Sequence, residues 1–242
     1  MTEELAAAET EGAAGAGEQA ALPATVAVGE LAVATWPEGQ AVVPMSAPFM
    51  ALTNFNDHAG YHAALLDAVL ASEQDARFRD TIFKGGCGVK VRNIPAWNAP
   101  AAALIHARAL RLAHRALSQR PVYADDTWAS VYRAGAYCMP HSHLRSDVSI
   151  VYMLDPGDPD PDDRLAGQLC FADPRIDACC PHQPGRVTQH LLPTMDQGAM
   201  LIFASDYLHS VNPYAGVRPR VTLSWNISLK PLPGRPGEGW KT

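Results

Sequence analysis

The hydrophobic pattern changes near residue 122, and this change restricts the fold more than any other feature of the chain. Before it, apolar residues recur about every 3.6 positions, as in helices, and after it they recur every second position, as in strands. Glycine- and proline-rich turns separate the later segments, the longest being DPGDPDPDD at residues 155–163. Six strands are predicted, at residues 127–133, 147–154, 167–171, 186–192, 198–203 and 220–229.

Two amphipathic helices are predicted in the first half of the chain. The first covers residues 57–76 with Asn56 or Asp57 as its cap, and the second covers residues 100–117 with Asn98 just before it. Pro100 suits the first turn of the second helix, and the glycine cluster KGGCG at residues 84–88 separates the two. The apolar stripes consist of Tyr61, Leu65, Leu66, Val69 and Leu70 in the first helix and of Ile105, Ala109, Leu112 and Ala116 in the second.

Two helices followed by many short strands predict an α+β, mainly β fold. An antiparallel barrel or sandwich would form the later part, with the N-terminal helices packed on one side. Residues 1–22 are an acidic, Ala- and Gly-rich segment with almost no large apolar side chains, so they are predicted to be a disordered tail. We expect residues 23–242 to form a single domain, with its helical part at about 57–117 and its barrel at about 122–229.

The composition restricts the partners that this chain can have. The formal net charge is −6 and no basic run is present, which argues against nucleic acid and anionic membranes. No apolar stretch approaches the roughly 20 residues of a membrane helix, and the acidic N-terminus lacks the order of a secretory signal. The five cysteines are odd in number and form no CxxC, so a disulfide framework is not expected. These features predict a soluble cytoplasmic protein.

The last predicted strand, RVTLSWNISL, has the most regular alternation. Apolar residues such as Val221 and Leu223 point one way, while Arg220, Thr222 and the polar residues that follow point the other way. Contact with water is the commoner explanation for such a polar face. The alternative is a polar pocket in which Arg220 binds an anion.

A histidine pair, His141 and His143, lies just before the strand predicted at 147–154. Two residues apart on a strand means the same face, so both rings can point at one ion, and imidazole suits iron, zinc, copper and nickel. The pair alone is a weak signal, since such histidines are often surface or hydrogen-bonded residues. A third histidine, His209, follows the apolar strand at 198–203, and Arg220 lies 11 residues after it.

Three histidines with an arginine are what a non-haem iron site needs when its co-substrate is a dicarboxylate. The iron would bind the keto-acid end, and the guanidinium of Arg220 would bind the far carboxylate through two hydrogen bonds. The hydroxyl of Thr222 shares the face of Arg220 and could add a hydrogen bond. Four other histidines belong to the predicted helices and are expected to be surface or boundary residues, namely His58, His62, His106 and His114.

The C-terminal half resembles the Fe(II)/2-oxoglutarate-dependent oxygenase superfamily, and within it a bacterial and phage subgroup with an HxH…H…R motif. Four segments carry the resemblance in the same order as in that subgroup, over about residues 127–229. They are HSHLRSDVSIVYML, GQLCFADPR, GAMLIFASDYLHSV and RVTLSWN. Leu144 stands where the subgroup usually has proline, Ile150 where it has glycine and Asp206 where tryptophan is common, so the substrate cannot be carried over.

The resemblance implies a double-stranded β-helix, which is a jelly-roll or cupin-like barrel. It also implies Fe(II) held by His141 and His209, and 2-oxoglutarate bound through Arg220. Such an enzyme hydroxylates a small molecule, amino acid or peptidyl group and releases succinate and CO2. Tyr137 and Tyr152 lie beside the HxH in sequence and could contact the co-substrate, although both could equally be aromatic residues of the core.

The third iron ligand is a choice between His143 and Asp147. Most of the superfamily has a carboxylate where His143 stands, whereas the subgroup has histidine. Asp147 lies four residues after His143, which is about 13 Å along a strand at ~3.3 Å per residue, so only a bent loop could bring it to the metal. We therefore favour His143. In the alternative arrangement His143 lies outside the coordination sphere, and water or substrate fills the third position.

Two other functions fit the same residues. A three-histidine dioxygenase of the cupin kind would oxidise its own substrate without 2-oxoglutarate, and Arg220 would then hold the substrate's carboxylate. A non-catalytic barrel would bind a metal or a small acid as a structural or sensing module. Arg145 and Arg218 are expected at the surface rather than at an acidic substrate, and a homodimer is the default expectation for a soluble enzyme.

Overall fold

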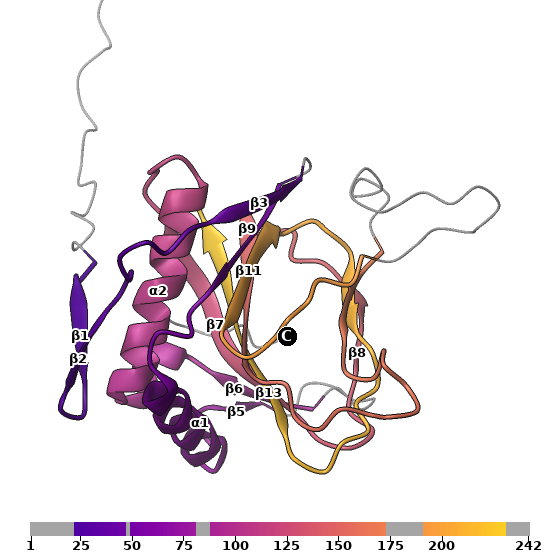
Figure 1. The fold of residues 1–242 in the computed structure, drawn as a ribbon. Helices are drawn as coiled ribbons and strands as arrows, with labels where there is room; N and C mark the ends of the chain where they lie inside the picture. The colour runs from indigo at the N-terminus through magenta and orange to yellow at the C-terminus, as the bar shows by residue number, and fades with distance from the viewer. Residues whose placement is uncertain (1–21, 47–48, 81–87, 173–190, 231–242) are drawn as a thin grey trace, which may run out of the picture.

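The computed structural model describes residues 22–46, 49–80, 88–172 and 191–230 (Figure 1). The predictions for the N-terminal tail, for residues 84–87 of the glycine cluster and for residues 186–190 lie outside these ranges. No helix in the described ranges has both the length and the apolar character needed to cross a membrane.

An eight-stranded antiparallel sheet forms the centre of the molecule. Its strand order is β3-β4-β11-β9-β13-β7-β6-β5, so β13 lies between β7 and β9. The predicted strands at 127–133, 147–154, 198–203 and 220–229 all belong to this sheet, and the alternating segments therefore form strands as expected. The bounds are β3 Val43–Ser46, β4 Met50–Asn54, β5 Arg79–Asp80, β6 Val89–Arg92, β7 Tyr123–Tyr132, β9 Val148–Asp155, β11 Ala199–Ala204 and β13 Arg220–Ser228.

A smaller antiparallel sheet faces the larger one. It consists of β10 (Leu169–Phe171), β12 (His209–Val211) and β8 (Cys138–His141), in that order. Leu191, at the end of the strand predicted at 186–192, forms an isolated bridge with Phe171 and extends this sheet on the β10 side. A pocket lies between the two sheets and is lined by residues of both. Two facing antiparallel sheets are the arrangement expected of a double-stranded β-helix.

The helices α1 (Ala59–Glu73) and α2 (Pro100–Ala116) and the short 3-10 helix η1 (Ile94–Trp97) pack on the side of the larger sheet away from β8 (Figure 1). Their apolar stripes form the core as predicted, because Leu65, Val69, Ile105 and Leu112 are fully buried. The apolar face of β13, which includes Leu223, is equally buried against them. Burial at about 25 cal/mol per Å² of apolar surface holds the helices on this face.

The helix α2 begins at Pro100 as predicted, whereas the start of α1 differs from the prediction. The helix α1 begins at Ala59 rather than at Asp57, and its N-cap is His58 without a side-chain cap. The carboxylate of Asp57 instead accepts a hydrogen bond of 2.9 Å from the buried guanidinium of Arg108 on α2. Ala99, not Asn98, is the N-cap of α2, because Asn98 adopts a left-handed conformation at the end of η1. Asp57, one of the two residues expected to cap α1, therefore forms a tertiary contact instead.

Several short strands were not predicted. They are the hairpin of β1 (Thr25–Val28) with β2 (Leu31–Ala34), the strands β3 to β6, and β8 and β12 in the smaller sheet. Each has five residues or fewer, which is too short for a convincing period of two. The pairing of β4 and β6 also depends on strands that are distant in sequence, namely β11 for β4 and β7 for β6.

Candidate metal centre

The smaller sheet brings His141 and His209 together. They are direct partners in the antiparallel register of β8 and β12, and their ring centres lie 4.3 Å apart. The rings of Phe203 and Phe171 pack on His209, with centres 5.0 and 5.8 Å from that imidazole. Cross-strand pairing and aromatic packing together fix the direction of these rings.

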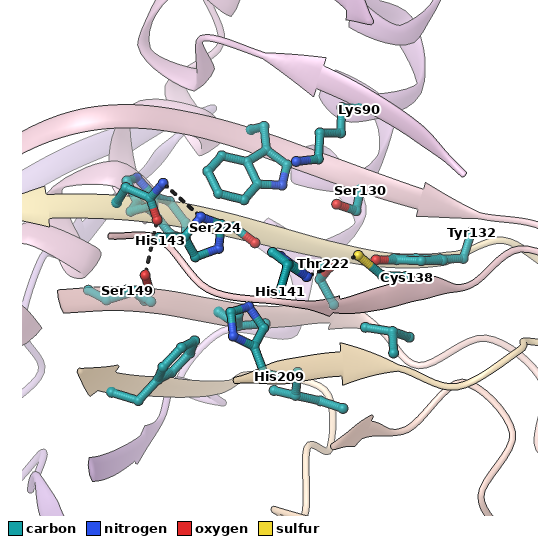
Figure 2. A pocket seen from close by; sticks show the side chains of 18 of the residues that line it. Lys90, Ser130, Tyr132, Cys138, His141, His143, Ser149, His209, Thr222 and Ser224 are labelled. Atoms are coloured by element: carbon teal, nitrogen blue, oxygen red, sulfur yellow. Dashed lines mark hydrogen bonds between the residues drawn. The ribbon is translucent and has the colours of Figure 1, made fainter. Parts of the chain in front are cut away.

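The HxH turn brings His143 to the same point. Its backbone N–H donates to the carbonyl of Ser205 at 2.7 Å, which anchors the loop between β8 and β9. The ring centre of His143 lies 5.0 Å from His141 and 5.2 Å from His209. One nitrogen of each ring lies within 4.8 Å of the others, and Figure 2 shows the three rings converging in the pocket. The three histidines are therefore a candidate metal centre.

Hydrogen bonds fix the tautomers of two of these rings. Nδ1 of His141 lies 2.8 Å from the carbonyl of Met139, and Nδ1 of His209 lies 2.9 Å from the carbonyl of Tyr207. A carbonyl can only accept, so each Nδ1 carries the proton and donates it. The lone pair of each Nε2 is then available, which is the arrangement of a metal-binding histidine with a supporting carbonyl.

His143 has a different partner. Its Nδ1 lies 3.3 Å from the amide nitrogen of Asn226, and the amide oxygen of Asn226 accepts a hydrogen bond of 3.0 Å from the hydroxyl of Ser149. An amide can present either its oxygen or its nitrogen to the ring, and the hydroxyl can donate or accept accordingly. The oxygen must face Nδ1 if Nε2 of His143 is to bind a metal.

Burial keeps the three imidazoles neutral near pH 7. It lowers the pKa of His209 to about 4 and, with the neighbouring His209 and His141, lowers the pKa of His143 to about 2. Burial also lowers the pKa of His141. Neutral imidazole is the form that binds metals, so these rings need not lose a proton to do so near neutral pH.

The rival third ligand, Asp147, lies elsewhere. Its carboxylate accepts a hydrogen bond of 2.7 Å from the backbone N–H of Leu229, just after β13. Asp147 does not line the pocket and does not belong to the histidine cluster. The structure thus brings His143, and not Asp147, beside His141 and His209.

Arg220 lies deep in the same pocket. The residue is 2% exposed, and its guanidinium carbon lies 5.1 Å from the centre of the Tyr132 ring. Gly167, with a φ of +67°, allows the close approach of this side chain, because a Cβ there would lie 3.1 Å from Cδ of Arg220. Its buried Nη1 has no hydrogen-bond partner among the described residues. A buried, unsatisfied cationic donor is costly unless a ligand supplies the acceptor.

The polar face of β13 lines this pocket. From the sequence, contact with water was the commoner explanation for this face, and that explanation was wrong. Thr222 and Ser224 are 5% and 7% exposed, and with Arg220 and Asn226 they form part of the pocket wall. The second sheet, which covers this face, explains the difference, since its strands β8 and β12 were not predicted.

The two tyrosines expected near the co-substrate do not line the pocket. The hydroxyl of Tyr152 lies in the helix-side core, 2.7 Å from the hydroxyl of Tyr61 and 2.8 Å from Nε2 of His62. Alternation along β9 explains this, because Tyr152 packs with Ile150 on the helix side. Tyr137 is half-buried outside the pocket. The role expected for Tyr152 is therefore corrected.

Two further expectations concern polar residues outside the pocket. His62 is 6% exposed, so it is a core residue rather than a surface or boundary one. Arg218 forms ion pairs with Asp155 and Asp158 at 3.1 and 2.8 Å, which agrees with the expected surface role.

Sequence reasoning missed several residues of the pocket wall. Lys90 on β6, Trp128, Ser130 and Tyr132 on β7, and Cys138 on β8 all line it. The alternation of side chains along these strands could have indicated them. In TWASVYR it places Trp128, Ser130 and Tyr132 on one face, and in VKVR it separates Lys90 from the valines.

The donor set fits a divalent transition metal and a small acid. Three neutral imidazoles suit iron, zinc, copper or nickel. The unsatisfied Nη1 of Arg220 fits a carboxylate oxygen, which a guanidinium can bind through two parallel hydrogen bonds.

Comparison with known proteins agrees with this geometry. Residues 126–226 match the model of a family described as "Putative 2OG-Fe(II) oxygenase". A search of curated proteins gave no match.

Several solved structures share the fold at low sequence identity. The epimerase SnoN from nogalamycin biosynthesis, in complex with Fe3+, alpha ketoglutarate and nogalamycin RO, has a TM-score of 0.58 and 14% identity, with 79% of this chain and 88% of that chain covered. A prolyl-4-hydroxylase from Pseudomonas putida has a TM-score of 0.53 and 18% identity, with coverage of 74% and 92%. HygX from Streptomyces hygroscopicus, with nickel, 2-oxoglutarate and hygromycin B bound, has a TM-score of 0.53 and 13% identity, with coverage of 74% and 82%.

These likenesses confirm the double-stranded β-helix. The matched segment contains His141, His143, His209 and Arg220, together with most of both sheets. The likeness of this chain to the 2OG-Fe(II) oxygenase family lies in this segment.

Proposed function

We propose that this protein is a 2-oxoglutarate-dependent hydroxylase in which His141, His143 and His209 hold Fe(II) and Arg220 binds 2-oxoglutarate. The observation that carries the proposal is the buried guanidinium of Arg220, whose Nη1 has no partner among the described residues. It lines the same pocket as the three histidines. One small dicarboxylate can therefore reach both the metal and the arginine.

The bound iron would supply the oxidation, in which 2-oxoglutarate and O2 give succinate and CO2 and the substrate is hydroxylated. The protein's part is to position these reactants. Nδ1 of His141 and of His209 donate to backbone carbonyls, which holds both Nε2 atoms toward the centre of the pocket. The amide of Asn226 would hold His143 in the same way.

Arg220, Thr222 and Tyr132 form the proposed site for the far carboxylate of 2-oxoglutarate. Thr222 follows Arg220 on the same face of β13, and Tyr132 is the direct partner of Arg220 on β7. The guanidinium and the threonine hydroxyl can both donate to one carboxylate. A charge-assisted pair in this buried position is stronger than the same pair in water.

Apolar side chains surround the histidines and keep water away from the reaction. Phe203 of β11, Leu169 of β10 and Val211 of β12 line the pocket beside His209. Each is buried. A dry site strengthens the electrostatic contacts of the bound acid and limits side reactions.

The runner-up function is a three-histidine dioxygenase that does not use 2-oxoglutarate. The specific observation in its favour is the ligand set, because the cluster contains three histidines and no carboxylate. Arg220 would then bind the substrate's own acid group.

Oxygen uptake and succinate formation separate the two functions. The wild-type protein loaded with Fe(II) should consume O2 and form succinate slowly when 2-oxoglutarate is added, even without a substrate. Arg220→Ala should raise the 2-oxoglutarate concentration for half-maximal rate by about 10- to 100-fold, since hydrogen bonds to charged groups contribute about 1.5–3 kcal/mol. Arg220→Lys should recover only part of this, because an ammonium cannot make the paired contact. Oxygen uptake that is independent of 2-oxoglutarate would favour the runner-up.

The proposal also covers organisation and setting. We propose that residues 23–242 act as one oxygenase domain in the cytoplasm, as a monomer or homodimer, on a small-molecule, amino-acid or peptidyl substrate. The solved relatives support this range, since one contains hygromycin B and another, from Trichoplax adhaerens, a peptide fragment.

A further inference from the structure

A chain of hydroxyl and amide groups ends on the ring of His143. Ser149 of β9 and Asn226 of β13 are direct partners across the larger sheet, and Ser205 follows directly after β11. The hydroxyl of Ser205 lies 2.8 Å from the hydroxyl of Ser149, which donates to Oδ1 of Asn226 at 3.0 Å. Nδ2 of Asn226 lies 3.3 Å from Nδ1 of His143. These four residues therefore form one continuous chain of hydrogen bonds, of which Figure 2 shows the part from Ser149 to His143.

The direction of every bond in this chain follows from one donor. Ser149 has a single hydroxyl proton, which it donates to Asn226, so the hydroxyl of Ser205 must donate to Ser149. The amide nitrogen of Asn226 can only donate, so Nδ1 of His143 accepts. A neutral imidazole whose Nδ1 accepts carries its proton on Nε2. In this direction of the chain, the other nitrogen of His143 holds an N–H rather than the lone pair that a metal needs.

His143 differs in this respect from the other two histidines of the metal centre. Nδ1 of His141 and Nδ1 of His209 donate to backbone carbonyls, so both Nε2 atoms hold lone pairs. A carbonyl only accepts and therefore fixes the tautomer of its partner ring, whereas an amide can present either a donor or an acceptor. The hydrogen-bond partner of His143 thus allows both tautomers of this ring.

Binding of a metal through Nε2 of His143 requires the opposite direction of the chain. The amide of Asn226 must turn over, so that Oδ1 accepts from Nδ1 of His143 and Nδ2 donates to Ser149. The hydroxyl of Ser149 then donates to that of Ser205. The ring gains a proton at Nδ1 for the one that leaves Nε2, so its charge does not change. The two serines are 3% and 1% exposed, so bulk water competes little for these contacts.

The reversed chain leaves one buried donor without an acceptor. The hydroxyl of Ser205 forms no hydrogen bond with the described residues besides the one to Ser149. In the observed direction this hydroxyl donates to Ser149, but in the reversed direction it only accepts, which is unfavourable for a buried donor. The two serines therefore favour the tautomer of His143 that cannot bind a metal.

We propose that Ser149 and Ser205 are positioning residues that act on His143 through Asn226, and that His143 becomes the third metal ligand only when this chain reverses. In the metal-free protein the chain keeps the proton of His143 on Nε2. This inference rests on the proposed function, because it assumes that His143 binds the metal.

Long-range NMR correlations between the ring protons and nitrogens of the histidines show directly which nitrogen carries the proton. Zn(II) serves as the metal, since it is diamagnetic and binds imidazole. The signals that are lost in His143→Gln identify this ring. Ser149→Ala breaks the chain, and Asn226→Asp replaces the amide by a carboxylate, which only accepts. Ser228→Ala is the matched control, because Ser228 is a buried serine of β13 whose hydroxyl donates to Asp125 outside the pocket.

The expected result in wild type and in Ser228→Ala is the same. In the metal-free protein, the proton of His143 should be on Nε2 and those of His141 and His209 on Nδ1. Addition of Zn(II) should move the proton of His143 to Nδ1 and leave the other two tautomers unchanged. These spectra alone test the direction of the chain, so the proposal remains falsifiable even if another variant does not fold.

The two variants of the chain should differ from wild type before the metal is added. Asn226→Asp should already carry the proton of His143 on Nδ1. Ser149→Ala should show a mixture of both tautomers, because the hydroxyl of Ser205 then lacks an acceptor in either direction of the amide. Its Zn(II) affinity should equal that of wild type or be up to about tenfold higher, since metal binding no longer costs the loss of a hydrogen bond by that hydroxyl.

The outcomes that overturn the inference are distinct from those that contradict the proposed function. A proton on Nδ1 of His143 in metal-free wild type, or an unchanged tautomer in Ser149→Ala, would overturn the inference and leave the proposed metal site intact. If Zn(II) shifts the signals of His141 and His209 but leaves the proton of His143 on Nε2, His143 is not a ligand and the inference fails with that part of the proposed site. No change at any histidine would contradict the proposed function itself.

Discussion

Two groups of buried and half-buried histidines lie on opposite faces of the larger sheet, and burial does not distinguish them. His62, in the helix-side core, is 6% exposed, while His209, in the pocket, is 5% exposed. Burial lowers the pKa of both His106 and His209 to about 4. A lowered pKa therefore does not identify a functional histidine in this protein.

The partners of the rings distinguish the two groups. His62 is bonded to the hydroxyl of Tyr152, and His106 accepts a hydrogen bond of 3.0 Å from the indole of Trp225. The rings of His141 and His209 instead bond to carbonyls through Nδ1 and face each other through the remaining nitrogen. Convergence of unused nitrogens, rather than burial, indicates the metal site.

The largest expected effect comes from removing one histidine of each group. His209→Ala should lower Fe(II) affinity by more than about 100-fold, because even residues that only support a ligand contribute 10- to 100-fold. His106→Asn keeps an acceptor for Trp225 and should leave Fe(II) affinity unchanged. Binding of Fe(II) to the anaerobic apoprotein by calorimetry measures both. Equal losses in the two variants would contradict the distinction.

The next effect concerns the amide beside His143. Asn226→Ala should lower Fe(II) affinity by about 10- to 100-fold, since His143 loses the group that orients its ring. Asn226→Asp places a carboxylate oxygen toward Nδ1 of His143 and should restore most of the affinity. If neither variant changes metal binding, His143 is not a ligand and the site uses only His141 and His209.

Tyr152 provides a test on the opposite face of the sheet. Tyr152→Phe leaves Tyr61 and His62 without their common partner, so it should lower the free energy of unfolding by about 1–3 kcal/mol. Affinity for 2-oxoglutarate should not change. Urea unfolding measures the change in stability, and titration with 2-oxoglutarate measures the change in affinity. If Tyr152→Phe binds 2-oxoglutarate more weakly under conditions where the variant is fully folded, Tyr152 belongs to the site.

The last test concerns a pH dependence of stability in the metal-free protein, which is small near neutral pH. The unfolded chain takes up a proton on His106 near pH 6.5, whereas the folded protein does so only near pH 4. The unfolded state thus binds more protons between these values, and stability falls as the pH falls through this window and is constant above it. The loss amounts to about 1.4 kcal/mol per pH unit for one histidine at most.

His106→Asn isolates this contribution from that of the carboxylates. The free energy of unfolding of this variant should depend less steeply on pH between 6.5 and 4.5 than that of wild type, with parallel curves above pH 7. Parallel curves over the whole range would show that the pKa of His106 is the same in the folded and the unfolded protein.

The features predicted from the sequence depend on long periodic segments. The alternation of β7, β9, β11 and β13 and the apolar stripes of α1 and α2 are strong local patterns, and all six form as expected. The sequence also indicated that His209, after the strand at 198–203, and Arg220, at the start of the strand at 220–229, could lie near the same pocket. His143 was preferred over Asp147 because of strand length and because the subgroup has histidine at this position, and the structure agrees in placing it beside His141.

The missed features depend on contacts between distant segments. The strands β8 and β12 have only four and three residues, so nothing local showed that they cover the polar face of β13. Tyr152 was expected near the co-substrate because it lies close to the HxH in sequence, whereas the tyrosine that lines the pocket beside Arg220 is Tyr132. The register of β7 against β13, which pairs Tyr132 with Arg220, is set by tertiary structure. The place of Lys90 in the pocket wall is set by the register of β6 against β7, which is also tertiary.

The central claim is that three histidines and Arg220 bind one metal chelate of 2-oxoglutarate. Anaerobic titration of the apoprotein with Fe(II) and then with 2-oxoglutarate tests it most directly, by the weak visible charge-transfer band of the chelate. We predict that the band appears in wild type and His106→Asn, requires much more 2-oxoglutarate in Arg220→Ala, and is absent in His209→Ala. Iron binding without a band in wild type, or a band that persists unchanged in His209→Ala, would contradict the account.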